Sequence, residues 1–288
     1  MSDMTPFIEI ILIAIGTSIS CAVLGNFLIL RKLSMMTDAI SHTVLLGIVI
    51  SFFIFQDLHS PWLLIGATLM GLLTVWGTEL LIQTKLVAPD SALGLLFPFF
   101  FSCSVILINL YGANVQLDTD AVLLGELAFA PFDRWFIGDI DMGAKALYIS
   151  CINVIINLSM VYLFYKELVV ATFDETFAKL SYISPLLVYY GLMSLVSLTA
   201  VVSFQAVGSI LLIAFMIVPA MVAALWAKTL GKRIIVSIIV GIIGSILGIS
   251  LAVYYNTSLA GMMATVLCAL FLLSWCIVQG IKQYRKVE

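Results

Sequence analysis

The chain has 288 residues, of which 63% are apolar and only 10% are charged, and its formal net charge is −3. Soluble domains carry roughly 25% charged residues, so this composition excludes a soluble enzyme, a disordered regulator and a nucleic-acid-binding protein. Long apolar stretches with few charges are typical of a polytopic membrane protein. We therefore expect the lipid bilayer to surround this chain. The five cysteines are odd in number and form no C-x-x-C pair, so we expect neither a disulfide framework nor a structural zinc site.

The apolar stretches predict an all-α fold with eight or nine transmembrane helices in a single transmembrane domain, residues 1–288. The predicted spans are residues 7–30, 34–55, 61–82, 92–111, 146–165, 185–204, 206–227, 233–253 and 259–280. A further stretch, residues 121–132, is too short to cross a bilayer and contains Glu126 and Pro131. We expect it to be re-entrant or to lie on the surface, because irregular backbone at membrane depth must be shielded by protein.

Basic residues orient these spans. Eleven of the 13 lysines and arginines fall in loops that share one side of the membrane, and only Arg134 and Lys145 fall on the other side. The positive-inside rule makes the first side cytoplasmic. The sequence therefore predicts an N-terminus outside the cell and a C-terminus in the cytoplasm.

The predicted outer loops are acidic. Asp118 and Asp120 lie in one of these loops, and Asp57 and His59 lie in another. Acidic loops attract cations, although only over short distances at physiological salt. We interpret these residues either as part of ordinary solvated loops or as an outer site that hands metal to the membrane domain.

The segment of residues 30–47 places an acid and an imidazole within a predicted span. Asp38 and His42 are four residues apart, so they share one face of a helix. Ionisable residues at membrane depth are costly and indicate a functional site, and a carboxylate with an imidazole suits manganese, iron or zinc. Alternatively, Asp38 caps the helix or faces lipid headgroups, and His42 is a packed histidine bonded to a carbonyl. Two ligands do not complete a metal shell, so a second copy of the chain or water would supply the rest.

Several enzyme motifs are missing from the chain. It contains no H-E-x-x-H, no G-x-S-x-G and no G-x-x-x-x-G-K-[ST] sequence. We therefore expect no catalytic residues, no permanently bound cofactor, and a separate nucleotide-binding chain if ATP drives transport. The alternative of another class is a proton-coupled secondary transporter that uses Asp38 and His42 as a proton relay.

Residues 166–184 form the longest predicted cytoplasmic insert between spans. Thr172 or Asp174 would cap a short helix there, with Phe173 and Phe177 on its apolar side. Such a helix either lies on lipid or docks into a groove of a partner protein.

The pair of predicted spans after this insert contains residues that interrupt a regular helix. Gln205, Gly208 and Pro219 lie within the otherwise apolar stretch of residues 203–227. A proline deep in a helix bends it and frees backbone carbonyls, which a neighbour or a cavity must satisfy. These three residues, together with Glu126 of the short outer stretch, are candidates for the pathway or its gate.

Three blocks of the sequence together resemble the permease subunits of the bacterial ABC importers for manganese, zinc or iron. They are FLILRKLSMMTDAISHTVLLG, TFDETFAKL and SLTAVVSFQAVGSILLIAFMIVPAMVAA, at residues 27–47, 172–180 and 197–224. The second block is similar to the family's F-D-x-x-x-A helix and the third to its Q-x-V-G…P-A segment. The resemblance runs over nearly the whole chain. Leu46 departs from the family pattern, because many members have proline at this position. The resemblance therefore does not decide whether the second span is bent there.

This resemblance implies a non-enzymatic transport subunit of the bacterial cytoplasmic membrane that works by alternating access. Asp38 and His42 would be the metal ligands in its translocation pathway, and Phe173, Asp174 and Ala178 would couple it to an ATP-binding subunit. The implied assembly pairs two copies of the permease with cytoplasmic ATP-binding subunits. An extracellular metal-binding protein would deliver the metal to its outer face.

The resemblance also favours one metal. Residues 118–134, DTDAVLLGELAFAPFDR, are more similar to manganese-type than to zinc-type members, which implies Mn²⁺ as the transported ion, with Zn²⁺ and Fe²⁺ as alternatives. The ligand pair itself suits all three metals, and intrinsic affinity would favour zinc.

Overall fold

The computed structural model describes residues 4–56, 62–111, 127–137 and 140–287. Nine helices in this part of the chain are long and apolar enough to cross a membrane. They are α1 (Met4–Leu30), α2 (Met36–Phe55), α3 (Trp62–Gln83), α4 (Pro89–Tyr111), α6 (Lys145–Leu163), α9 (Pro185–Val207), α10 (Ser209–Trp226), α11 (Leu230–Tyr255) and α12 (Leu259–Val287). Each coincides with one predicted span, so the all-α, multi-pass architecture is confirmed.

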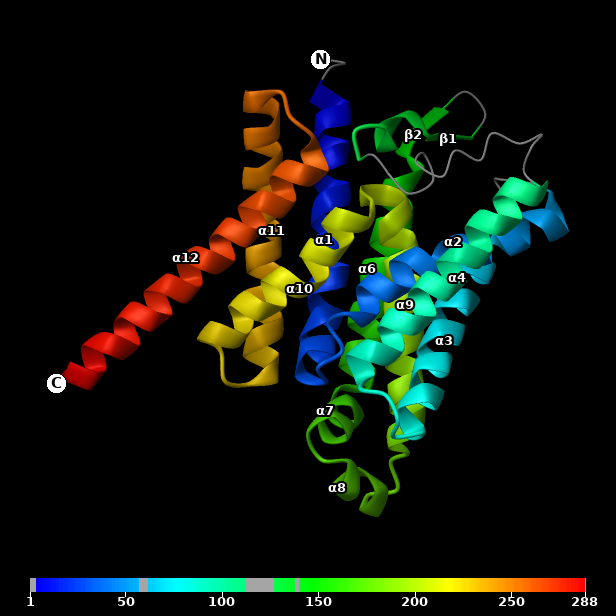
Figure 1. Ribbon diagram of the computed structural model, residues 1–288. Helices are drawn as coiled ribbons and strands as arrows, with labels where there is room; N and C mark the ends of the chain where they lie inside the picture. The colour runs from blue at the N-terminus through cyan, green and yellow to red at the C-terminus, as the bar shows by residue number, and fades with distance from the viewer. Residues whose placement is uncertain (1–3, 57–61, 112–126, 138–139, 288) are drawn as a thin grey trace.

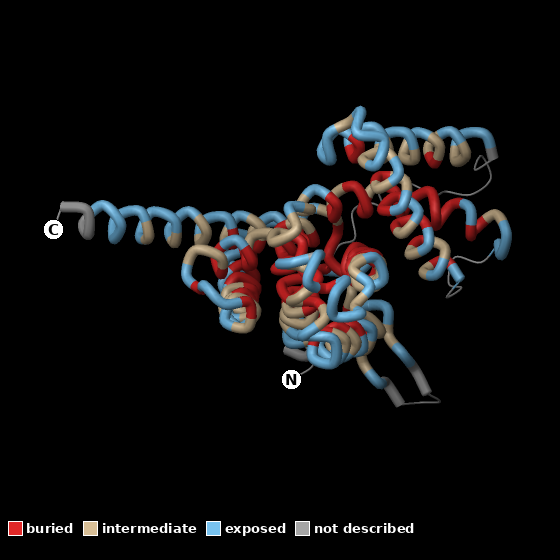
Figure 2. Tube along the Cα trace, turned by 90° about the horizontal axis from the view of Figure 1, so that it is seen from below, coloured by how far each residue is buried: buried red, intermediate tan, exposed pale blue. Residues whose placement is uncertain are grey.

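The helices pack around α1, which contacts α6, α9, α10 and α11. Helix α2 packs mainly against α3 and α4, and α12 packs against α10 and α11 (Figure 1). Buried residues concentrate in the middle of the molecule, whereas the C-terminal part of α12 projects away from it and is largely exposed (Figure 2). The core therefore lies where the N-terminal helices meet α9 and α10.

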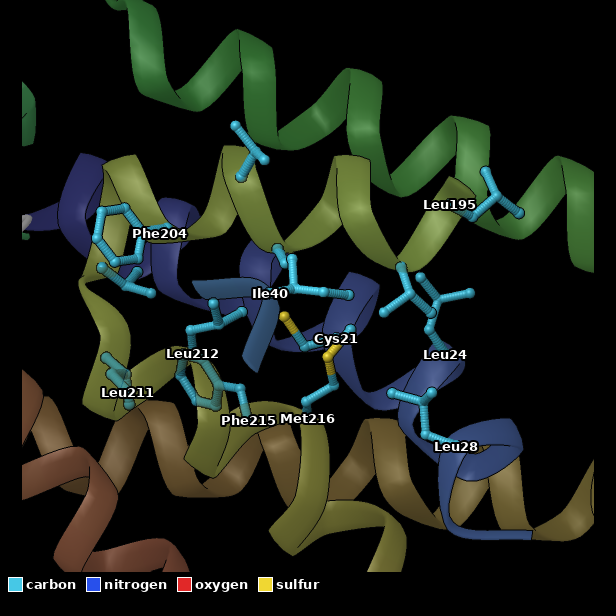
Figure 3. Packing of buried hydrophobic residues seen from close by; sticks show 14 of the residues in the cluster. Cys21, Leu24, Leu28, Ile40, Leu195, Phe204, Leu211, Leu212, Phe215 and Met216 are labelled. Atoms are coloured by element: carbon cyan, nitrogen blue, oxygen red, sulfur yellow. The ribbon is translucent and has the colours of Figure 1, made fainter. Parts of the chain in front are cut away.

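Figure 3 shows this core, in which the side chains are fully or almost fully buried. Cys21, Leu24 and Leu28 come from α1, and Phe215 and Met216 come from α10. The backbones of these two helices approach closely at Gly25, because a Cβ atom there would lie 2.8 Å from the carbonyl carbon of Met216. Small residues allow such approaches between transmembrane helices, where packing drives association.

A small antiparallel sheet lies at the same end of the molecule as the N-terminus (Figure 1). It pairs β1 (Arg134–Ile137) with β2 (Ile140–Ala144). No strand was expected here, and this short hairpin is an addition to the all-α architecture. Arg134 Nη2 donates to Glu9 Oε1 of α1 at 3.0 Å, and Gly143 has a positive φ of 98°. The sheet therefore depends on a contact with a distant helix and on one glycine conformation, neither of which a hydropathy pattern reveals.

The short outer stretch of residues 121–132 is described only from residue 127 onward. Its last residues form a turn and the 3₁₀ helix η1 (Ala130–Phe132). Leu127 is buried while Phe132 is exposed, so this piece rests against the helices with one side only. The predicted gate residue Glu126 lies outside the described residues, as do Asp57, His59, Asp118 and Asp120.

Candidate metal site

Asp38 and His42 lie side by side on α2, as their spacing predicts. The Asp38 Oδ1 atom is 3.4 Å from the His42 Nε2 atom, and 37% and 35% of the two side chains are exposed. This separation exceeds the usual 2.7–3.2 Å of a hydrogen bond. A Zn²⁺ ion about 2.1 Å from each atom would subtend an angle of about 108° there, which is close to tetrahedral. The distance between the two atoms is therefore compatible with a shared metal ion.

The start of α2 explains why an acid is tolerated at this position. Asp38 lies in the first turn of α2, where the positive end of the helix dipole stabilises a carboxylate. The N-cap residue is Met35, and no side chain caps this helix end. Ser41 Oγ donates to the backbone carbonyl of Asp38 at 2.7 Å. The alternative in which Asp38 serves as the helix cap is therefore wrong, and its carboxylate is left to face His42.

Two aromatic rings of α4 hold the imidazole of His42. The Phe97 ring stacks on it with centroids 5.7 Å apart and planes at 29°. The Phe101 ring meets it edge-on, with centroids 5.9 Å apart. The alternative of a histidine bonded to a carbonyl is not supported, because its polar contact within the described chain is to Asp38. Sequence reasoning missed Phe97 and Phe101, since both lie in a run of phenylalanines that a lipid-facing helix would equally carry.

The described residues do not complete a metal shell by themselves. They contain no group of three or more His, Cys, Asp or Glu side chains close enough to hold an ion. Asp38 and His42 provide one oxygen and one nitrogen, and both side chains retain an open side. Mn²⁺ prefers an octahedral set of ligands and structural Zn²⁺ a tetrahedral set. Any further ligands therefore lie outside the His, Cys, Asp and Glu side chains of the described residues.

The residues that interrupt the predicted spans of α9 and α10 make no polar contact with Asp38 or His42 among the described residues. Gly208, with φ 80°, is the single residue between α9 and α10, and Pro219 is buried within α10. Gln205 is exposed near the end of α9. No hydrogen bond or ion pair within the described residues connects any of them to Asp38 or His42. Their predicted role in the pathway stays a prediction.

Helix α10 nonetheless contacts the start of α2 through another residue. Thr37 Oγ1 donates to Met216 Sδ at 3.2 Å, and both residues are buried. Thr37 precedes Asp38 directly, so the position of α10 fixes the backbone next to the candidate ligand. This link was not visible in the sequence, because it joins residues 179 positions apart.

Replacing Phe97 by alanine is expected to weaken metal uptake without abolishing it. The aromatic contact is worth about 0.5–1.5 kcal/mol, which corresponds to roughly a 2- to 10-fold rise in the apparent Kd for the metal. Titrations of uptake against Mn²⁺ concentration would measure this apparent Kd. Phe99→Ala is the matched control, since that ring is 59% exposed and lies on the same helix. Equal affinities for the two variants would show that the rings do not hold the imidazole.

The insert after α6 forms two helices instead of one. Helix α7 (Tyr165–Phe173) continues almost directly from α6, and α8 (Glu175–Leu180) follows it. Phe173 ends α7, so its expected place on the same short helix as Ala178 is wrong. Phe177 of α8 is 55% exposed, whereas Ala178 is fully buried. The predicted short amphipathic helix therefore corresponds to α8 alone, because Asp174 leaves the helical conformation between α7 and α8.

Asp174 is the N-cap of α8. Its Oδ1 atom accepts hydrogen bonds from the backbone nitrogens of Thr176 at 3.0 Å and Phe177 at 2.9 Å, and from the Thr176 hydroxyl. The Thr176 hydroxyl bond, followed by the backbone bonds, lowers the pKa of Asp174 below its ordinary value of 3.8. The cap therefore stabilises α8 above pH 3.8, and this contribution is lost only as the pH falls through the lowered pKa. Helix α8 stays capped at every physiological pH.

Comparison with known proteins identifies the family of this chain. The model of the ABC 3 transport family matches residues 4–278. The chain belongs to this family. The resemblance seen in the three sequence blocks is thus confirmed, and the chain is a multi-pass membrane protein of a bacterial ABC transporter.

Relatives within the ABC 3 family carry names for two different metals. The zinc transport system membrane protein TroD of Treponema pallidum is 43% identical, over 92% of this chain and 72% of that protein. The manganese transport system membrane protein MntD of Bacillus subtilis is 38% identical, over 89% of this chain and 87% of its own length. Sequence similarity therefore places the chain among manganese and zinc permeases without separating the two.

Solved structures agree with this placement. PsaBC from Streptococcus pneumoniae, solved in complex with Fab, matches with a TM-score of 0.76 and 29% identity, covering 93% of this chain and 90% of that one. An inward-facing conformation of a putative metal-chelate type ABC transporter matches with a TM-score of 0.66 and 16% identity, over 93% of this chain and 84% of the other. The second likeness concerns the fold alone.

Proposed function

We propose that this ABC 3 family permease is the membrane subunit of an ATP-driven importer for a divalent metal, and that Asp38 and His42 bind the ion during its passage. The observation that carries the proposal is the Asp38–His42 pair, whose ligand atoms stand 3.4 Å apart on a transmembrane helix and remain partly accessible. The metal is the cargo, so the site must release it. Two protein ligands, with the rest supplied by water or a second copy, suit transient binding.

The proposed energy source is a separate ATP-binding subunit that docks at α8. Helices α7 and α8 lie at the end of the molecule opposite the N-terminus and the β1–β2 sheet (Figure 1). Basic residues gather at that end, including Arg31, Lys166 and Lys179, which supports its assignment to the cytoplasm. Phe173 and Phe177 are exposed there beside the capped start of α8. An amphipathic helix of this kind fits a groove on a partner.

The proposed assembly contains two copies of the permease, two ATP-binding subunits and an extracellular metal-binding protein. The incomplete ligand set at Asp38 and His42 supports a second copy beside the site. The N-terminus would lie outside the cell and the C-terminus in the cytoplasm of a bacterial cell membrane. Relatives named as components of metal transport systems support the same plan.

Mn²⁺ is the proposed principal cargo. Permeases from Bacillus subtilis and Listeria monocytogenes that are named for manganese transport are 38% and 31% identical to this chain. Zinc is the second candidate, because the relative from Treponema pallidum, 43% identical, is named for zinc transport. The Asp38–His42 pair accommodates both ions, so selectivity would come from the remaining ligands or from the delivery protein.

Reconstitution tests this function directly. The permease with its ATP-binding subunits, in proteoliposomes supplied with the metal-binding protein on the outer side, is expected to take up ⁵⁴Mn²⁺ only when ATP is supplied on the cytoplasmic side. Competition with Zn²⁺ and Fe²⁺ then ranks the three cargoes. Uptake by the permease alone, driven by a pH gradient, would instead establish the proton-coupled transporter. Stronger competition by Zn²⁺ than by unlabelled Mn²⁺ would make zinc the principal cargo.

Replacing Phe177 or Asp174 by alanine is expected to reduce the amount of ATP-binding subunit that co-purifies with the permease. The first change removes an exposed apolar contact, and the second removes the cap that holds α8 in shape. Tyr254→Ala is the control, because Tyr254 is an exposed aromatic residue of α11 outside α7 and α8. Normal co-purification and normal ATP-driven uptake of both variants would contradict docking at α8.

A further inference from the structure

A pocket lined by polar and apolar residues lies between the two short helices and the transmembrane body at the proposed cytoplasmic end. It has a volume of about 780 Å³ and is lined by residues of α3, α7, α8 and α9 together with the end of α1. Glu79 of α3 and Lys179 of α8 both line it. Helices α7 and α8 also contact α6 and α9, so contacts at the wall of this pocket are one of the routes by which their movement can reach the metal-binding helices.

Arg31 makes such a contact. It follows the last residue of α1, and its Nε atom donates to Thr172 Oγ1 of α7 at 3.3 Å. Its guanidinium lies over the ring of Tyr189 in α9, 5.6 Å from the ring centroid. A guanidinium can donate to an acceptor and stack on an aromatic face at the same time, which an ammonium does less well. One side chain thus joins the ends of three helices.

The backbone from Arg31 to α2 is held tightly. Lys32 has a positive φ of 60°, and its nitrogen donates to Ile29 O at 3.1 Å, while the nitrogen of Leu33 donates to Leu28 O at 2.8 Å. These two bonds form a Schellman motif that closes α1. The nitrogen of Met36, the first residue of α2, then donates to Leu33 O at 3.0 Å. A displacement of Arg31 therefore moves the start of α2, where Asp38 lies.

We infer that Arg31 is a positioning residue that couples the α7–α8 segment to the Asp38–His42 pair. This inference rests on the proposed function, in which α8 receives the movement of the ATP-binding subunit. The guanidinium carries that movement from Thr172 in α7 to the closed turn between α1 and α2. Arg31 touches no metal and acts through the backbone of α2.

The test uses the whole complex in proteoliposomes and measures the metal transported per ATP hydrolysed. Arg31→Gln is expected to lower this ratio by about threefold or more, while leaving the bound amount of ATP-binding subunit and the Mn²⁺ affinity of the permease unchanged. Thr172→Val is expected to lower it in the same direction. The double variant should be no worse than Arg31→Gln alone, because both changes break one contact. Lys32→Gln is the matched control, since it removes an exposed charge from the adjacent position.

Hydrogen exchange tests the contact between Arg31 and α7 without a transport assay. In the purified permease, Arg31→Gln should speed amide exchange in residues 165–180, whereas Lys32→Gln should not. A wild-type complex that shows no ATP-dependent uptake would contradict the proposed function. Hydrogen exchange would still test whether Arg31 holds α7 through Thr172. An unchanged metal-to-ATP ratio in Arg31→Gln, or unchanged exchange, would overturn the inference. If Arg31→Gln does not fold, Thr172→Val alone decides, since it keeps the arginine and removes its acceptor.

Discussion

Alanine at Asp38 or at His42 is expected to abolish metal uptake by the reconstituted importer. Among the described residues, the pair offers one carboxylate oxygen and one imidazole nitrogen, 3.4 Å apart, and each substitution removes one of these two ligands. Loss of a residue that merely orients a metal ligand typically costs 10- to 100-fold in affinity. Removal of a ligand itself is therefore expected to lower uptake by at least about 100-fold. Initial rates of ⁵⁴Mn²⁺ uptake at saturating ATP would measure the effect.

A matched control separates ligand loss from damage to the helix. Asp90 occupies the first turn of α4, as Asp38 does in α2, and it is exposed. Asp90→Ala should therefore leave uptake near the wild-type rate. Equal expression and equal recovery of ATP-binding subunits would show that all three variants assemble. Uptake at the wild-type rate in either Asp38→Ala or His42→Ala would show that the Asp38–His42 pair is not the metal site of the pathway.

The features that the sequence predicts correctly are local ones. The nine spans follow from apolar stretches whose length matches the bilayer, and each is found as a helix. Asp38 and His42 are neighbours because four residues make one turn of a helix. Of the two caps expected for the helix of the insert, Thr172 and Asp174, the structure has Asp174, and this cap is equally local, since its acceptor and donors lie within three residues.

The features that the sequence does not predict depend on contacts between distant segments. Phe97 reaches His42 only because α4 packs against α2, and Arg31 reaches Thr172 across 141 residues. The β1–β2 sheet is anchored by Arg134, whose partner Glu9 is 125 residues away. Apolar patterns do not encode these pairings, because hydropathy along one helix does not specify which other helix packs against it. Phe173 differs from these cases, since its placement on α7 and not on the helix of Ala178 follows from the local cap geometry of Asp174.

Replacing Gly25 by alanine is expected to cause the largest loss of stability and, with it, the loss of transport. A Cβ atom at Gly25 would overlap the carbonyl oxygen of Met216 and lie 2.8 Å from its carbonyl carbon. Both atoms are backbone, so no change of rotamer relieves the overlap, and α10 must move away from α1. Overpacking typically costs about 1–3 kcal/mol and occasionally more. Because Met216 accepts the hydrogen bond of Thr37, the movement also pulls the residue next to Asp38.

Thermal unfolding in detergent and ATP-driven uptake would measure the two consequences of Gly25→Ala together. Gly191→Ala is the matched control, since nothing lies within 4 Å of a Cβ atom there and alanine favours the helical conformation of α9. That variant should keep or slightly raise the unfolding temperature and transport normally. A Gly25→Ala protein as stable as the control would show that α1 and α10 do not pack as closely as their backbones indicate. A stable Gly25→Ala protein that fails to transport would locate the effect in the Met216–Thr37–Asp38 connection instead of in overall folding.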